Sequence, residues 1–320
     1  MTQNGQDMDA ILVMAYGSPQ RPEDVEPYYT HIRRGRAPSP EQLTDLLARY
    51  ARVGGVTPLH RHTDAVVDRL REMLAAEGTP LPVYVGMKHW HPFVKEAVQR
   101  MSDDGIRHAH AIVLAPHYSR LSIGEYRKYL DEAIATLAEP MTVDLVESWH
   151  RQPEFIAMMA DLVRGGLEKF APDEQSDVRV VFSAHSLPMR IRTWGDPYES
   201  ELRASARVVA EQVGLAQWDW AWQSAGATGE PWLGPDILDF LKELADQGVK
   251  RVLQVPIGFV SEHLEVLFDI DLEARQRAAE LGMRLERSEL PNARPGFITA
   301  VRAALRDQPV NAAVQSSIAR

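Results

Sequence analysis

Two segments of the chain place ionisable side chains directly after apolar runs that are typical of buried strands. Val180–Pro188 reads VVFSAHSLP, with His185 just past the run, and Val255–Asp269 reads VPIGFVSEHLEVLFD, with Glu265 beyond a short loop. Apolar, β-branched runs of this kind form the strands of parallel sheets. Because ligands bind at the carboxyl ends of such strands, we expect the imidazole and the carboxylate to meet there. Together they suit proton transfer, metal binding or both.

Several other apolar runs also end in polar residues, and a parallel sheet would direct all of these ends to one crevice. The residues concerned are Tyr16, Lys88, His89, His117, Gln223 and Gly258. Polar loops follow strands in any α/β protein, so one such residue carries little information and only their convergence favours a shared site. His185, expected to be neutral near pH 7, is the candidate base.

Three carboxylates follow one another at the spacing of an α-helix. Glu265, Asp269 and Glu273 stand at i, i+4 and i+8, which predicts one acidic helical face. Like charges at this spacing destabilise a helix, so we expect something to compensate them. A divalent cation is the natural candidate, and imidazole with carboxylate suits iron, zinc or manganese. The alternative is an ordinary solvated acidic face.

A basic, aromatic stretch, Pro27–Arg36, reads PYYTHIRRGR. Aromatic rings and guanidinium groups suit a planar anionic ligand, either a ring system with carboxylates or a nucleotide. The chain has neither GxGxxG nor GxxxxGK[ST], so the usual phosphate-binding loops are missing. A solvated basic turn is the alternative. The remaining paired histidines are expected to be surface residues; they are His60, His62, His108 and His110.

Strand-like runs alternate with helical patterns along the chain, which predicts right-handed βαβ units and mostly parallel sheets. The strand-like runs are Ala10–Ala15, Pro82–Gly86, Ala111–Pro116, Thr142–Val146, Val178–Ala184, Trp218–Trp222 and Arg251–Pro256. We predict an α/β fold of two Rossmann-like lobes with a cleft between them. The first lobe comprises 9–117 and 293–307, the second comprises 118–292, and 308–320 form a mobile tail.

Composition excludes several classes of function. The 320 residues carry a net charge of −10 and a pI of about 5.6, which argues against nucleic acid as a partner. The absence of cysteine excludes disulfides, a thiolate nucleophile and cysteine-bound iron–sulfur clusters. No segment resembles a signal peptide or a transmembrane helix. We therefore expect a soluble, cytoplasmic monomer.

Ordered motifs from about residue 10 to residue 304 make the chain similar to the ferrochelatases, and most of all to their bacterial coproporphyrin branch, in which MAYG supplies a tyrosine. The motifs are LVMAYGSP (12–19), YYTHIRRGR (28–36), RY (49–50), GGVTPL (54–59), GMKHWHPF (86–93), IVLAPHYS (112–119), FSAHSLP (182–188), WQSAG (222–226), PWLGPD (231–236) and VPIGFVSEHLEVLFD (255–269). The last of these blocks is highly specific.

This resemblance implies insertion of Fe²⁺ into coproporphyrin III to give coproheme, with the porphyrin between two Rossmann-like lobes. It implies no permanently bound cofactor, and a downstream haem-pathway enzyme as a possible receiver of the product. His185 and Glu265 match the catalytic and metal-binding pair, and Tyr16 matches a ligand of the product iron. Asp269 and Glu273 would form an acidic path for the cation. The residues that match porphyrin or propionate contacts are Arg33, Arg49, Tyr50, Thr57 and Tyr126; close relatives often carry serine at position 57.

Three other functions were weighed from the sequence. A chelatase for cobalt or nickel and another tetrapyrrole would share the fold, but such enzymes usually rely on pairs of histidines. A non-catalytic haem carrier would need no acidic path for a free cation. A nucleotide-dependent oxidoreductase would need the glycine-rich fingerprint that this chain lacks.

Overall fold

The first of two parallel sheets is built from the N-terminal half of the chain. The computed structural model describes residues 10–226 and 228–307. Four strands pair in the order β2–β1–β3–β4. Their bounds are β1 Ala10–Ala15, β2 Val83–Met87, β3 His108–Val113 and β4 Thr142–Val146. Every residue of β1 is buried, as expected for a central parallel strand with helices on both faces.

The second sheet repeats this arrangement in the C-terminal half. Its strands pair in the order β6–β5–β7–β8, all parallel. Their bounds are β5 Arg179–His185, β6 Asp219–Gln223, β7 Arg251–Val255 and β8 Arg284–Arg287. The structure thus confirms the predicted α/β fold with two mostly parallel sheets.

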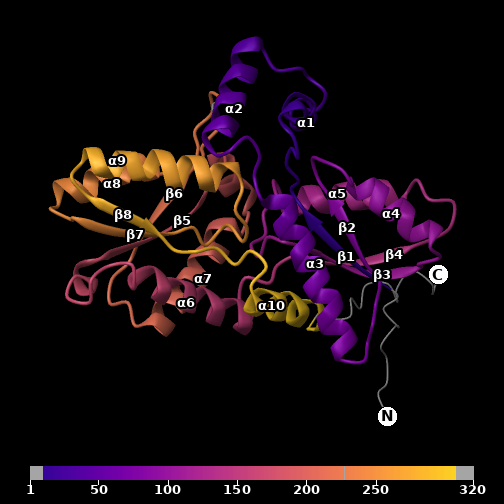
Figure 1. The fold of residues 1–320 in the computed structure, drawn as a ribbon. Coiled ribbons are helices and arrows are strands. Elements are labelled where there is room, and N and C mark those ends of the chain that lie inside the picture. The colour runs from indigo at the N-terminus through magenta and orange to yellow at the C-terminus, as the bar shows by residue number, and fades with distance from the viewer. Residues whose placement is uncertain (1–9, 227, 308–320) are drawn as a thin grey trace.

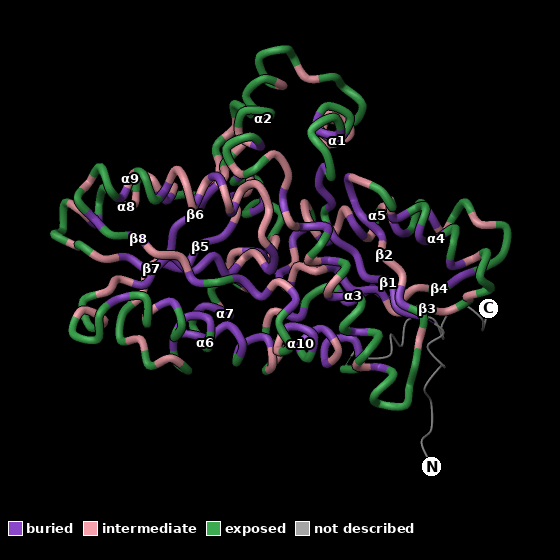
Figure 2. The backbone as a smooth tube through the Cα atoms, in the orientation of Figure 1, coloured by how far each residue is buried: buried purple, intermediate pink, exposed green. Residues whose placement is uncertain are grey.

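Helices cover both faces of each sheet (Figure 1). On the first sheet, one face carries α3 (Leu59–Ala76) and α10 (Pro295–Arg306), and the other carries α4 (Val94–Asp103) and α5 (Ile123–Ile134). On the second sheet, one face carries α6 (Pro153–Leu167) and α7 (Tyr198–Val213), and the other carries α8 (Ile237–Asp246) and α9 (Arg275–Glu280). The central strands β1 and β5 are therefore largely shielded from water on both faces, and they are among the most continuously buried parts of the backbone (Figure 2).

One hydrophobic core runs through both lobes. Side chains of β1 and α3 belong to the same buried cluster as those of α6, α7 and β5. Helix α10 provides the connection, because it packs against α3 and β3 of the first lobe and against α6 of the second. Phe297, on α10, is almost fully buried within this cluster. The C-terminal helix therefore fixes the two sheets relative to each other.

A helical extension of the first lobe reaches the second. Helices α1 (Val25–Ile32) and α2 (Pro40–Arg52) lie between β1 and α3 in the chain and project from the body of the molecule (Figure 1). Ser39 caps α2 by accepting a hydrogen bond from the Gln42 amide, and Pro40 occupies the first turn. The guanidinium groups of Arg49 and Arg52, near the end of α2, lie 4.9 and 4.8 Å from the ring centre of Phe268 in the second lobe.

The structure corrects the predicted lobe boundary. Strand β4 pairs with β3 in the first sheet, so a division after residue 117 separates strands that are hydrogen-bonded to each other. The first sheet ends with β4, at Val146. The predicted tail, 308–320, lies outside the described residues.

Helices α9 and α10 were not predicted, and neither were β8 and α1, whose compositions hide them. Strand β8 reads RLER, because as an edge strand it has only one neighbour and tolerates charged residues. Helix α1 reads VEPYYTHI and was treated as part of a basic turn, since its polar and aromatic residues show no clear apolar stripe. In the described residues, no helix has both the length and the apolar character needed to cross a bilayer.

Candidate active site

His185 and Glu265 meet, as the sequence predicted. His185 is the last residue of β5, and Glu265 lies at the start of the helix that follows the loop after β7. Nε2 of His185 lies 3.4 Å from Oε1 of Glu265. On the other side of the ring, Nδ1 makes a close hydrogen bond to the carbonyl of Ser186, and the His185 carbonyl accepts a 3.1 Å hydrogen bond from the hydroxyl of Tyr198. These contacts fix the ring at the carboxyl edge of the second sheet.

The structure contradicts the expectation that His185 is neutral near pH 7. A carbonyl faces Nδ1 and a carboxylate faces Nε2, so both ring nitrogens are placed to donate, which is the pattern of an imidazolium. Burial alone would lower the pKa of His185, but Glu265 outweighs it and raises the pKa to about 9. Burial would likewise raise the pKa of Glu265, whereas His185 lowers it to about 2. The metal-free site thus holds an ion pair.

This ion pair gives a prediction for the metal-free protein. In an NMR titration, the His185 ring should change protonation near pH 9, well above its ordinary pKa of 6.5. Glu265→Gln removes the negative charge that raises the pKa of His185, but the ring stays buried. The pKa of His185 should therefore fall to its ordinary value or below. The His185 signal is assigned by its disappearance in His185→Ala. An unchanged pKa in Glu265→Gln would contradict the pairing.

The acidic helix is not the α-helix that the spacing predicted. Residues Val266–Ala274 form a π-helix, whose i→i+5 hydrogen bonds widen the turn and which is rare outside functional sites. Burial, Glu265 and Glu273 raise the pKa of Asp269 to about 7, against the lowering effects of Ser224 and Arg49. The three carboxylates therefore do interact electrostatically, although the geometry of their helix differs from the prediction.

The metal-free protein relieves this repulsion with its own side chains. The Ser224 hydroxyl donates a close hydrogen bond to Oδ2 of Asp269. Ser224 follows β6 and has a φ of 60°, a conformation that non-glycine residues rarely adopt and that often accompanies functional sites. Arg49, from α2, places Nη1 3.8 Å from Oδ1 of Asp269. Arg49 is therefore paired with the acidic helix.

Tyr16 faces the pair from the first lobe. It follows β1, and desolvation by the surrounding protein, with a smaller contribution from the Glu265 carboxylate, raises the pKa of its phenol. The rings of Tyr16 and His89 are 4.6 Å apart, and Nζ of Lys88 lies 5.7 Å from the centre of the Tyr16 ring. The carboxyl edges of the two sheets thus present Tyr16 on one side and Glu265 with His185 on the other.

A buried ammonium group supports the Tyr16 side. Lys88 is only 4% exposed, forms a close ion pair with Glu125 of α5 and lies 5.4 Å from the ring centre of Tyr126. Burial lowers the pKa of Lys88, although Glu125 opposes this shift. His89 is held by a 3.1 Å hydrogen bond to His31 of α1, and burial lowers the pKa of His89 to about 3, so its ring is neutral.

The remaining predicted contact residues fall into two groups. Tyr50, Thr57 and Tyr126 are buried in the first lobe, and Glu265 helps to raise the pKa of Tyr50. Thr57 donates to the hydroxyl of Ser18 at 3.3 Å, so it also holds the loop after β1. Arg33, by contrast, bonds locally: its Nε donates to the carbonyl of Arg36, and its guanidinium lies 5.5 Å from the Tyr29 ring centre. The structure does not bring Arg33 to the His185–Glu265 pair.

Some residues of the site were not predicted as such. His263 acts electrostatically on both His185 and Glu265, and its burial lowers its pKa. Ser224 belongs to the WQSAG motif (222–226) but received no role there, and Glu125 belongs to none of the motifs; each gains its place through a contact between distant segments. The expectation of surface histidines is wrong for His60, which is 8% exposed and accepts a 3.2 Å hydrogen bond from the amide of Ser18.

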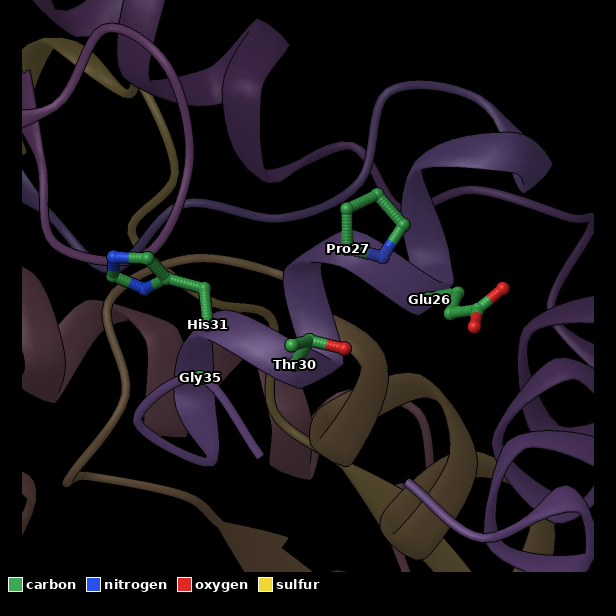
Figure 3. A pocket seen from close by; sticks show the side chains of 5 residues that line it. All are labelled: Glu26, Pro27, Thr30, His31 and Gly35. Atoms are coloured by element: carbon green, nitrogen blue, oxygen red, sulfur yellow. The ribbon is translucent and has the colours of Figure 1, made fainter. Parts of the chain in front are cut away.

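An open hollow of about 470 Å³ lies on α1, next to the Tyr16 side of the site. Glu26, Pro27, Thr30, His31 and Gly35 line it, and Figure 3 shows the side chains of Glu26 and His31 pointing away from each other. His31 is the residue that hydrogen-bonds His89, which in turn contacts Tyr16. The hollow therefore borders the predicted site without containing the His185–Glu265 pair.

Comparison with known proteins assigns the whole described chain to one family. Residues 8–308 match the family model described as "Ferrochelatase". A ferrochelatase of Herpetosiphon aurantiacus is 47% identical over 300 residues, which are 93% of this chain and 98% of the relative. The coproporphyrin III ferrochelatases of Geobacillus kaustophilus and Bacillus subtilis are 44% and 42% identical, over 91% of this chain and 93% and 94% of theirs.

Solved structures support the fold alone. The sirohydrochlorin chelatase SirB from Bacillus subtilis subspecies spizizenii, in complex with cobalt, is similar with a TM-score of 0.57 at 12% sequence identity. The similarity covers 97% of this chain and 98% of that chain. The two-lobed chelatase fold predicted from the sequence is thereby confirmed.

Proposed function

This chain belongs to the ferrochelatase family, and we propose that it inserts Fe²⁺ into coproporphyrin III to form coproheme. The observation that carries the proposal is the pairing of His185 with Glu265 across from Tyr16, at the facing edges of two sheets. Relatives named as coproporphyrin III ferrochelatases favour this substrate over other porphyrins. Iron is a substrate here, and we propose no permanently bound cofactor.

The His185–Glu265 pair suits the proton balance of the reaction. Insertion of Fe²⁺ into a free porphyrin releases two pyrrole protons, so a base must accept protons as the metal enters. In the metal-free protein Glu265 keeps His185 protonated. A cation arriving at Glu265 neutralises that carboxylate and lowers the pKa of the ring, which then releases its proton to solvent. The neutral ring can next accept one pyrrole proton and pass it to solvent before it accepts the second, so metal arrival itself activates the base.

The π-helix offers a route for the incoming cation. Glu273 and Asp269 lead toward Glu265 along one helix and interact electrostatically. Since burial and these neighbours raise the pKa of Asp269 to about 7, this carboxyl can give up a proton when a cation approaches. We propose that Fe²⁺ passes from Glu273 to Asp269 and then to Glu265, displacing Arg49 from its 3.8 Å contact with Asp269.

Arg49 is then free to bind a propionate. We propose that Tyr50, Thr57 and Tyr126, which are buried in the first lobe, lie beneath the macrocycle, and that Arg33 adds a further positive charge. Coproporphyrin III carries four propionates and protoporphyrin IX carries two. A desolvated, charge-assisted contact contributes about 1.5–3 kcal/mol. Loss of even one such contact would therefore weaken binding about tenfold or more.

The test is anaerobic incubation with Fe²⁺ and either porphyrin, followed by absorption. We expect kcat/KM for coproporphyrin III to exceed that for protoporphyrin IX by about tenfold or more. Equal efficiencies would remove the protein from the coproporphyrin branch but leave it a ferrochelatase. Tight binding of iron coproporphyrin with no metallation of the free porphyrin would instead indicate a haem carrier.

Tyr16 is proposed to bind the iron of the product. A phenol is protonated at neutral pH, and the raised pKa of Tyr16 makes it harder still to ionise, so a phenolate should form only when iron replaces the proton. Tyr16→Phe should therefore change the visible spectrum of the bound ferric product and speed its release, while metal insertion persists. An unchanged product spectrum in this variant would contradict the assignment.

The remaining expectations stay predictions. They are a cytoplasmic location, a monomeric state and transfer of coproheme to a downstream enzyme of the haem pathway. Slow release of product from Tyr16 would suit such a transfer, because free iron porphyrin would otherwise be lost to solution.

A further inference from the structure

Two histidines and an aspartate gather at the amino-terminal edge of the first sheet, and we propose that they bind a divalent transition-metal ion. They are His108 and His110 of β3 and Asp144 of β4. The proposed reaction centre lies at the opposite, carboxyl edge of this sheet, where Tyr16 follows β1. The proposed site is therefore separate from the reaction centre, and it does not depend on the proposed function.

Strand geometry brings the three side chains to one face. Alternate residues of a strand point to the same side, so His108 and His110 project together. Ile112, the next residue in this series, packs into the core that contains α3 and α10, whereas Ala109 and Ala111 pack into the core on the opposite face. Asp144 pairs in register with His110, and in a parallel sheet registered neighbours share a face. The expectation that the two histidines are surface residues is wrong, because both belong to β3 and are partly buried.

The donor atoms are close enough to share one ion. Nε2 of His108 lies 3.1 Å from Oδ2 of Asp144, and Nε2 of His110 lies 3.8 Å from the same oxygen. One ligand atom from each residue fits within a mutual distance of 4.8 Å. Metal–ligand bonds of about 2.0–2.2 Å in tetrahedral geometry place donor atoms about 3.4 Å apart, so small rotations of the side chains would suffice.

The donor set selects the class of metal. Two imidazoles and one carboxylate suit Zn²⁺, Fe²⁺ or Co²⁺ rather than Ca²⁺ or Mg²⁺, which prefer oxygen ligands alone. All three side chains are partly buried, which limits competition from water while leaving room for a water or second ligand on the ion. Among these ions Zn²⁺ binds such sites more tightly than Fe²⁺ or Co²⁺.

A metal here would act on the fold. Strand β4 is at the edge of the sheet and is hydrogen-bonded only to β3 among the described strands. An ion held by His108, His110 and Asp144 would join these two strands through side chains as well as through the backbone. A ligand that binds only the native state stabilises a protein, and the stabilisation grows with the logarithm of the ligand concentration once this exceeds Kd. We therefore expect the ion to raise the melting temperature without entering the metallation chemistry.

The experiment titrates Zn²⁺ into the full chain by isothermal calorimetry. The His185→Ala, Glu265→Gln background is used so that the reaction centre contributes no high-affinity binding. We expect this background to bind one Zn²⁺ and to melt at a higher temperature with it. Loss of a residue that only supports a metal ligand already lowers metal affinity about 10–100-fold. Adding His110→Gln or Asp144→Asn, which removes a ligand itself, should weaken Zn²⁺ binding by at least that factor. Circular dichroism verifies that these variants fold.

A matched control distinguishes binding at the three-residue site from binding at an exposed histidine. His91 also pairs with a carboxylate, with Nδ1 2.9 Å from Oε1 of Glu96, but that cluster includes no second histidine. His91→Gln should leave the Zn²⁺ affinity unchanged. The proposal is overturned if the background protein binds no Zn²⁺, or if the folded His110→Gln and Asp144→Asn variants bind it as tightly as the background. In the otherwise wild-type chain, His110→Gln should keep full metallation activity.

Discussion

Replacing His185 by alanine should abolish iron insertion into coproporphyrin III while the protein continues to bind the porphyrin. The ring lies at the edge of β5, within 3.4 Å of Glu265, and both of its nitrogens are engaged in polar contacts. It is proposed to act on protons and metal, and the porphyrin is proposed to bind mainly through other residues. A positioned general base contributes about 10²–10⁴-fold to a rate, and here the same side chain also borders the metal. We expect turnover to fall by at least this factor.

The measurement pairs metallation rates with porphyrin affinity, followed by fluorescence quenching. His91→Ala provides the control, because it also removes a histidine that pairs with a glutamate, but one that lies on the surface. Near-normal turnover in His185→Ala would remove the central role assigned to this residue. Loss of porphyrin affinity in parallel with turnover would instead make His185 part of the binding surface.

The sequence was most informative where burial dictates composition. Strands β1 and β4 were predicted with their observed bounds: the central strand β1 is apolar along its length because helices cover both of its faces, and the edge strand β4 keeps three apolar residues in TVDLV. Strand β8, at an edge, has no such constraint and was missed. The boundary of the first lobe was misplaced for a related reason: nothing in the composition of β4 reveals which of two sheets it joins, and only its pairing with β3 does so.

The candidate site was predictable in position but not in chemical state. Both His185 and Glu265 follow apolar runs, and the topology of parallel sheets was enough to bring them together. The protonation of His185 depends on the outcome of two opposing effects, burial and a carboxylate at 3.4 Å. Sequence patterns reveal neither the burial of the ring nor its distance from the carboxylate. The ordinary pKa of histidine was therefore the only available reference, and it was misleading.

Contacts between the lobes also could not be predicted from the sequence. Arg49 was matched to a propionate contact, yet in the metal-free protein it pairs with Asp269 and stacks near Phe268. This contact exists because α2 extends from the first lobe onto the π-helix of the second. The i, i+4 spacing correctly grouped the carboxylates of that helix, but it could not reveal a π-helix, which differs from an α-helix in hydrogen bonding rather than in residue type.

Along the acidic helix, the effect of losing a carboxylate on turnover should depend on its distance from His185. Glu265→Gln should reduce kcat for metallation by at least about 10²-fold, and Glu273→Gln by less than about tenfold. Glu265 lies beside the proposed base, whereas Glu273 is two steps farther out and acts on Asp269. Both substitutions keep size and remove one negative charge, so each is the matched control of the other.

The Glu265→Gln variant also distinguishes two explanations of its loss of metallation activity. Without the carboxylate, His185 should be neutral at pH 7 and therefore ready to accept a proton. If activation of the base were the limiting step, Glu265→Gln would lose little activity or even gain some. A large loss, with a raised KM for Fe²⁺, would instead mean that the carboxylate is needed to hold the cation where the porphyrin nitrogens can take it. Equal losses in Glu265→Gln and Glu273→Gln, or the reverse order, would contradict a path that ends at Glu265, because the reacting centre must be the point most sensitive to a lost charge.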